Sequence, residues 1–210
     1  MCIYDRAYYL RGLENLWADI YLNTKELEKL LDILVELNLK AINIYSRLKY
    51  DGYYLWDDWG LQDRLMISPD TWRKIWKPRY HMIFEAAHKA EMFTFLHSCG
   101  YIVDILDDLI EAGLDVIQMD QQENMGLKLL GERFSGKLTF FSPVDIQTVM
   151  NTGSEQEIRQ YCHQMVDLLG TPKGGFIAKY YIDWKGVGHS QKALKAMCQE
   201  FLKIANQSSG

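Results

Sequence analysis

MFTFLHSCG, residues 92–100, is a short apolar run that ends abruptly in polar side chains. The residues from Phe93 to Leu96 are typical of a buried β-strand, and Gly100 allows the chain to turn sharply after it. Polar residues at the end of a buried strand are often functional. The stretch therefore predicts a strand whose C-terminal end carries a site.

His97 and Cys99 lie two residues apart within this stretch. In an extended chain their side chains face the same side, with Cα atoms about 7 Å apart. Zinc binds His nitrogen and Cys sulfur at about 2.0–2.3 Å, so the pair suits a metal site. Two residues of these types can also simply be buried, and the local pattern leaves that alternative open.

Around this stretch the sequence alternates between strand-like and helix-like segments. The connections are too long for hairpins, which indicates parallel βαβ units. Residues before the first helix are expected to be extended, and a bend is expected near Pro78. Strands are predicted near residues 53–56, 93–96, 115–119, 137–141 and 176–179. Helices are predicted near 13–22, 25–49, 69–90, 101–112, 126–134, 155–169 and 190–204.

Each predicted strand is followed by polar residues, namely Asp57/Asp58, His97/Cys99, Asp120/Gln122, Asp145 and Tyr181/Asp183. In a parallel barrel these ends share one rim, where active sites lie. We therefore predict an α/β fold of the (β/α)8 TIM-barrel type in a single domain, residues 1–210. Five strands make an incomplete barrel. Either about 120–150 N-terminal residues are missing, judged from the usual barrel size, or another copy completes the sheet. A homo-oligomer is expected.

The composition excludes several other classes of protein. The net charge is −5 and long basic runs are absent, which argues against a nucleic-acid surface. The sequence has neither a signal peptide nor an apolar stretch of membrane-spanning length, so a cytoplasmic protein without a membrane partner is expected. Its four cysteines are widely spaced, unlike a disulfide framework. The 27 aromatic residues (6 Trp, 13 Tyr, 8 Phe) fill the core or line a pocket for a flat ligand.

Six motifs in order resemble the uroporphyrinogen decarboxylase family. They are GYYLWDDWGLQ (52–62), SPDTWRKIWKPRY (68–80), FLHSCG (95–100), GLDVIQMD (113–120), KLTFFSPVDIQ (137–147) and GGFI (174–177). More narrowly, the sequence is similar to the branch of corrinoid-dependent methyltransferases that includes enzymes methylating coenzyme M. The likeness covers nearly the whole chain but only about the last two-thirds of a family member.

The resemblance implies that His97 and Cys99 bind zinc, because they match the His and Cys of the H-x-C-G motif that bind zinc in that branch. The metal lowers the pKa of an acceptor thiol, which then attacks a methyl group on cobalt. The implied cofactors are zinc and either methylcobalamin or a corrinoid protein. A second Cys after the last strand completes the family's ligand set, but residues 178–183 read AKYYID. Asp183 is the expected substitute, with Asp57, Asp58, Asp120 and Glu123 as alternatives.

The remaining polar residues at the strand ends are expected to handle substrate. Asp57 and Asp58 would orient it or accept a proton, together with Tyr181 in the same pocket. It is equally possible that one of the two acids caps backbone N–H groups of the following loop and the other faces water. The expected substrate-binding residues are Trp59, Gln62, Asp120, Gln122 and Asp145.

Two other functions stay open at this stage. The first is uroporphyrinogen decarboxylation itself, which needs several cations for the tetrapyrrole carboxylates. The candidates, Arg6, Arg11 and Arg64, are few, and Arg11 is expected to pair with Glu14. The second is a truncated, non-catalytic barrel that acts as an oligomeric binding subunit.

Overall fold

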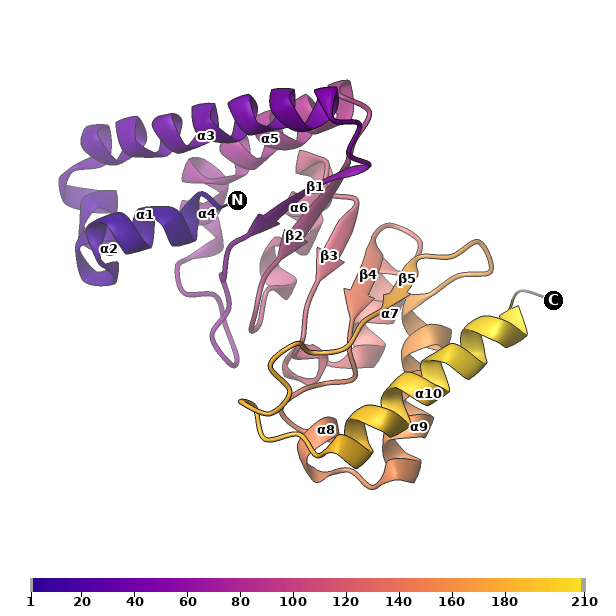
Figure 1. Cartoon of the computed structure of the whole chain (residues 1–210). Helices are drawn as coiled ribbons and strands as arrows, with labels where there is room; N and C mark the ends of the chain where they lie inside the picture. Colours follow the sequence, from indigo (N-terminus) through magenta and orange to yellow (C-terminus); the bar gives the residue numbers. More distant parts are fainter. Residues whose placement is uncertain (1, 209–210) are drawn as a thin grey trace. The chain divides into compact units, whose positions relative to one another are not determined.

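The computed structural model describes residues 2–208 as alternating strands and helices (Figure 1). The strands are β1 (Gly52–Trp56), β2 (Phe93–His97), β3 (Val116–Gln118), β4 (Thr139–Ser142) and β5 (Phe176–Ala178). They form an open sheet in the order β1-β2-β3-β4-β5, and the pairs β1/β2 and β4/β5 run parallel. All five strands predicted from the sequence are confirmed. The chain divides into two compact units, residues 1–116 and 117–210.

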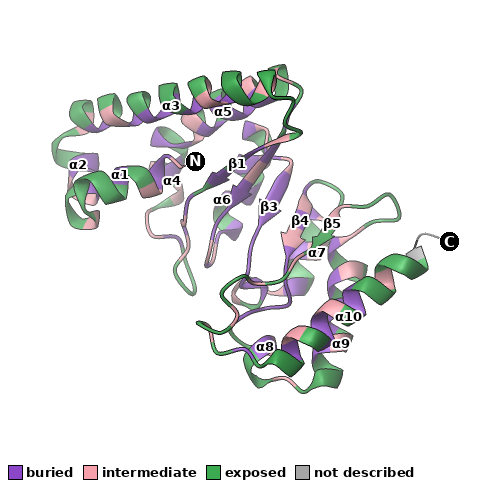
Figure 2. Ribbon diagram, viewed as in Figure 1, coloured by how far each residue is buried: buried purple, intermediate pink, exposed green. Residues whose placement is uncertain are grey.

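The first unit holds six helices among its described residues. They are α1 (Tyr4–Arg11), α2 (Leu13–Leu22), α3 (Thr24–Arg47), α4 (Pro69–Ile75), α5 (Lys77–Lys89) and α6 (Val103–Ala112). Helices α3 and α5 lie side by side, and α5 packs on β2 (Figure 1). Figure 2 shows α3 exposed on its outer face, as expected for a helix with one wide apolar stripe.

The predicted extended start of the chain is wrong, because α1 begins at Tyr4. Ile3, at its N-cap, has no side-chain capping bond. Instead, the N–H groups of Ile3 and Asp5 donate to the carboxylate of Asp57, more than 50 residues away in sequence. A tertiary contact thus satisfies two of the N–H groups at the start of α1, where a helix leaves such groups without partners of its own. Local sequence signals cannot reveal such a cap.

Local signals do explain the helices that follow β1. The Ser68 hydroxyl accepts the N–H of Thr71 and starts α4, with Pro69 at the first helical position. The predicted bend near Pro78 is confirmed as a break between α4 and α5 at Trp76. Gly113 ends α6 in the left-handed conformation, at φ 106°.

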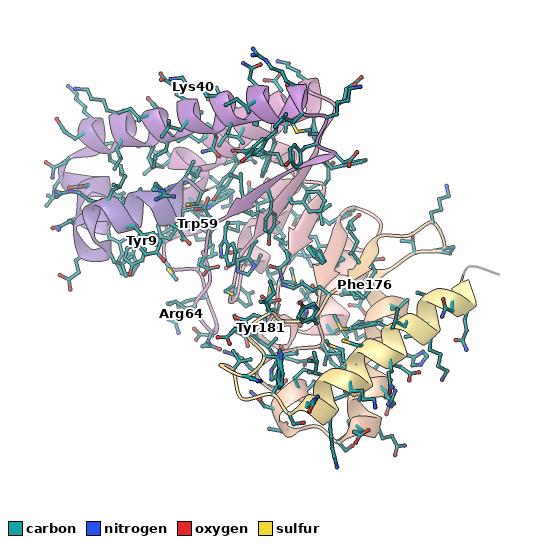
Figure 3. The ribbon with its side chains drawn as sticks, viewed as in Figure 1. Tyr9, Lys40, Trp59, Arg64, Phe176 and Tyr181 are labelled. Carbon is teal, nitrogen blue, oxygen red and sulfur yellow. The ribbon has the colours of Figure 1, made fainter. Side chains whose placement is uncertain are left out.

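A cluster of aromatic side chains forms part of the core of the first unit. Tyr4, Trp59, Trp72, Trp76 and Tyr80 are all at most 2% exposed. Tyr4 stacks on Trp59 with ring centroids 4.0 Å apart, and Trp59 meets Trp76 edge to face at 5.1 Å. Figure 3 labels Trp59 among these packed side chains. For these five residues, the core alternative of the sequence analysis holds.

The second unit contains η1 (Gln122–Asn124), α7 (Leu127–Phe134), α8 (Val149–Thr152), α9 (Glu155–Leu169) and α10 (Gln191–Ser208). Helix α9 starts with a capping box in which Ser154 and Glu157 each accept the other's backbone N–H. Helix α9 packs against both α7 and α10. Within residues 2–208, no helix is long and apolar enough to cross a bilayer.

A network of ion pairs joins α9 to α10 and yields a testable pH dependence. The carboxylate of Glu200 lies 3.0 Å from the Arg159 guanidinium, 3.0 Å from the His163 ring and 3.1 Å from the Lys203 ammonium. The pKa of Glu200 is lowered to about 2, mainly by the hydrogen bond from His163 and further by those from Lys203 and Arg159. Burial acts in the opposite direction but is outweighed. A carboxyl whose pKa is lowered in the folded state stabilises the protein at pH values above its pKa in the unfolded state. This contribution is lost as the pH falls through the lower pKa of the folded state.

Glu200→Gln is therefore expected to destabilise the protein by about 1 kcal/mol at pH 7, since the cationic partners are partly exposed to solvent. The difference from wild type should shrink between about pH 4.5 and pH 2. Denaturant unfolding at several pH values measures it. Asp167→Asn, on the exposed side of α9, is the charge-matched control. A Glu200→Gln deficit as large at pH 2.5 as at pH 7 would contradict the ion-pair explanation.

Candidate metal centre

The C-terminal ends of β1 and β2 bring two loops into contact in the first unit. Trp56 pairs with His97 in the register of the two strands, so the residues that follow each strand are neighbours. The pairing continues beyond the strands, because Asp57 N–H donates to the His97 carbonyl and Gly60 N–H to the Cys99 carbonyl. At Gly60, a Cβ atom would lie only 2.3 Å from the backbone nitrogen of Tyr101. The close approach of the loops therefore requires glycine there.

Asp58, His97 and Cys99 converge where these loops meet. The Cys99 Sγ lies 3.3 Å from the His97 Nε2, and an Asp58 Oδ1 lies 3.3 Å from the same nitrogen. The three ligand atoms are all within 4.8 Å of one another. Tetrahedral zinc with bonds of about 2.0–2.3 Å separates its ligand atoms by about 3.3–3.6 Å. The separations from the His97 nitrogen to the sulfur and to the oxygen match this spacing, and all three atoms stay within 4.8 Å, so the set is a candidate ligand set for such an ion.

The protonation state of Asp58 also suits a ligand. Burial tends to raise its pKa, but hydrogen bonds from His97 and from the backbone N–H of Cys99 outweigh this and lower it. Asp58 is therefore a carboxylate at neutral pH, as metal binding requires. Its side chain is 38% exposed, whereas His97 is buried, so the cluster is open on the Asp58 side.

Asp57, the neighbouring acid, is placed quite differently. Its carboxylate is fully buried and accepts from the N–H groups of Ile3 and Asp5 and from the Tyr80 hydroxyl, at 2.8–3.2 Å. Burial is the main cause that raises the pKa of Asp57 to about 7. This geometry matches the alternative in which one acid of the pair caps backbone N–H groups. The capped groups belong to α1 rather than to the following loop.

Asp5 is a residue of the site's surroundings that sequence reasoning missed. Its Oδ1 accepts the backbone N–H of Asp58 at 3.2 Å. Burial raises the pKa of Asp5 to about 6. No motif marks Asp5, because it lies in a stretch that reads as extended and only the tertiary fold brings it to β1.

Other residues expected near this end of the sheet lie apart from the cluster. Trp59 is fully buried in the aromatic core, where its Nε1 donates to the Tyr80 hydroxyl at 2.8 Å. Gln62 is exposed in the loop that follows. The predicted Arg11–Glu14 pair is wrong, since Arg11 pairs with Asp19 instead. Gly12, at φ 78°, breaks the helix between Arg11 and Glu14, so the two do not share a continuous helical turn.

In the second unit, two of the expected residues have their oxygens engaged. Asp120, 2% exposed, accepts from Gln118 at 2.8 Å and pairs with Lys179 at 3.1 Å. Asp145, fully buried, accepts the N–H groups of Glu123, Gln147 and Thr148 and the Thr148 hydroxyl. Lys179 is a cation that sequence reasoning missed. Its only local sign is a charge directly after an apolar strand.

The remaining expected residues of the second unit lie around β3 and the loop after β5. Gln122 is buried and donates to the carbonyls of Met119 and Pro143. Tyr181, labelled in Figure 3, lies with its ring 6.4 Å from that of His189. Asp183, the expected third metal ligand, is exposed and accepts the N–H of Gly186. Among the described residues, the acid that lies within 4.8 Å of the His97 and Cys99 ligand atoms is Asp58, one of the alternatives considered from sequence.

Comparisons with known proteins agree with this architecture. A methyltransferase from Methanosarcina mazei superposes with a TM-score of 0.70 at 19% identity, over 95% of this chain and 56% of that one. The chain thus spans little more than half of this structure, and the likeness shows the fold, an incomplete barrel of the TIM type. An N-acetylneuraminic acid synthetase from Leptospira borgpetersenii matches more weakly, with a TM-score of 0.46, 15% identity and coverage of 73% and 53%. A comparison with curated sequences finds no match.

The sequence itself carries the decisive comparison. The model of the family described as uroporphyrinogen decarboxylase (URO-D) matches residues 3–182, from the start of α1 to the loop after β5. This span includes every residue of the candidate metal centre. The chain belongs to the uroporphyrinogen decarboxylase (URO-D) family.

Proposed function

We propose that this chain acts in methyl transfer between a corrinoid and a thiol acceptor, with a zinc ion bound at Asp58, His97 and Cys99. The observation that carries the proposal is the convergence of one oxygen, one nitrogen and one sulfur within 4.8 Å at the ends of β1 and β2. The methyltransferase from Methanosarcina mazei supports it by fold. Methylcobalamin or a corrinoid protein is the proposed methyl donor.

Three protein ligands leave a fourth position on zinc, as catalytic sites require. A zinc ion bound there would lower the pKa of an acceptor thiol and favour its nucleophilic thiolate. The chain's own residues prepare this position. Asp58 keeps its negative charge through the hydrogen bonds from His97 and Cys99, and its exposed side gives access from solvent.

The two acids after β1 then have separate tasks. Asp58 serves as a ligand, and Asp57 anchors the N-terminus of α1 instead of touching substrate. In the second unit, we propose Asp120 and Tyr181 as residues that contact substrate, and Lys179 pairs with Asp120 at 3.1 Å. A homo-oligomer and a cytoplasmic location remain part of this proposal.

Zinc content and methyl transfer test the proposal together. We expect the purified chain to bind one zinc ion and to demethylate methylcobalamin in the presence of a small thiol, with activity lost on chelation and restored by zinc. Free cob(I)alamin absorbance reports turnover. A chain that binds neither zinc nor methylcobalamin would support the non-catalytic binding subunit. Turnover of uroporphyrinogen without zinc would support the decarboxylase.

A further inference from the structure

Helix α1 and the loop after β1 are joined by hydrogen bonds in both directions. The Asp57 carboxylate accepts the N–H groups of Ile3 and Asp5, at 3.1 and 2.9 Å. In return, the Asp5 carboxylate accepts the N–H of Asp58 at 3.2 Å. Each segment thus supplies both a carboxylate and a backbone donor to the other. We call this arrangement the Asp5–Asp57 clasp.

The clasp ends directly on the proposed metal centre. The residue whose N–H is held by Asp5 is Asp58, and the Asp58 side chain in turn accepts the N–H of Cys99 at 2.8 Å and faces His97. An acceptor at Asp5 therefore fixes the backbone from which the oxygen ligand projects. Hydrogen-bonding partners of metal ligands orient them and are worth about 10- to 100-fold in metal affinity.

The surrounding core keeps the clasp in one geometry. Tyr80 donates to Asp57 at 2.8 Å, and the ring of Tyr4, next to Asp5, stacks on Trp59 with centroids 4.0 Å apart. The backbone N–H of Trp59 donates to the hydroxyl of Ser98, which lies between the two β2-end ligands. Helix α1 is thus bonded to residues 57–59, and these are bonded in turn to residues 97–99; the two short segments together carry all three ligand atoms.

We propose that Asp5 is a positioning residue of the metal centre, acting through the N–H of Asp58 rather than by touching the metal. This inference rests on the proposed zinc site. Asp5→Ala removes the acceptor and is expected to lower zinc affinity by about 10-fold or more. Asp5→Asn keeps a side-chain carbonyl oxygen at the same place and is expected to restore most of the affinity.

The test uses the full chain, freed of metal and then titrated with zinc against a competing chelator. Cobalt(II) substitution adds a spectroscopic readout, since its visible bands respond to ligand geometry and a purely structural role for Asp5 would leave them unchanged. Glu14→Ala, which removes an exposed acid on α2, is the control. Thermal unfolding of the metal-free proteins shows whether each variant folds, and Asp5→Ser replaces Asp5→Ala if the latter does not.

The outcomes separate this inference from the proposed function. The inference is supported if the wild-type chain binds zinc and Asp5→Ala binds it more weakly with an altered cobalt spectrum. Asp5→Asn should then restore both the affinity and the spectrum. If the wild-type chain binds zinc and Asp5→Ala binds it with the same affinity, the positioning role is overturned, but the zinc site itself is not. An Asp5→Asn variant as weak as Asp5→Ala also overturns the positioning role, because charge rather than the hydrogen bond would then matter. A wild-type chain that binds neither ion overturns both proposals.

Discussion

Cys99→Ala is expected to reduce zinc affinity by more than about 100-fold, beyond the range seen for residues that only support a ligand. The thiolate is the softest of the three proposed donors, and its sulfur lies 3.3 Å from the His97 nitrogen. Its removal leaves one nitrogen and one oxygen donor, fewer than the three that a catalytic zinc site needs. Competition titration against a chelator of known affinity measures the loss.

Two comparisons make this result specific to the cluster. His97→Ala is expected to lose affinity to a similar extent, and Asp58→Asn to lose less, because an amide oxygen keeps the donor atom but not its charge. Cys198→Ala removes a half-buried thiol from α10 in the second unit and should leave zinc binding unchanged. If Cys198→Ala weakened binding as much as Cys99→Ala, the cluster of Asp58, His97 and Cys99 would not be the zinc site.

Trp59→Ala is expected to lower the free energy of unfolding by about 3–5 kcal/mol, the usual cost of deleting a fully buried Trp side chain. Trp59 stacks on Tyr4 and meets Trp72 and Trp76 edge to face. Its Nε1 also donates to Tyr80, which holds Asp57. The substitution would therefore leave a cavity and loosen the anchor of α1. Urea unfolding followed by far-UV circular dichroism measures the change.

Trp56 provides the matched control for this prediction. It lies three residues earlier on β1, carries the same side chain and is 54% exposed. Trp56→Ala is expected to cost about 1 kcal/mol, because about half of the Trp56 side chain stays exposed to water in the folded state. Equal losses in the two variants would show that Trp59 is not the centre of the core. Trp59→Phe should lie between them, since it keeps the stacking on Tyr4 but lacks the indole N–H.

Much of the fold follows from patterns that extend over a few residues. The apolar runs before Asp57, His97, Asp120 and Ser142 predict the strands, because a buried strand needs consecutive apolar residues and ends where polar ones begin. Ser154 and Glu157 predict the start of α9 through a local capping box. The pairing of His97 with Cys99 is local as well, since alternate residues of an extended segment face the same side.

Short-range patterns predict the alternation of strands and helices, the polar ends of the strands and two of the three proposed metal ligands, because each depends on residues close together in the chain. The different roles of Asp57 and Asp58 depend on long-range packing. Adjacent acids are indistinguishable in sequence, but α1 buries one under its first N–H groups and leaves the other facing His97. The same long-range packing brings Asp5 to Asp58 and places Trp59 in the core. A contact between residues about 50 positions apart in sequence depends on how the helices and strands assemble, so short-range sequence patterns cannot predict it.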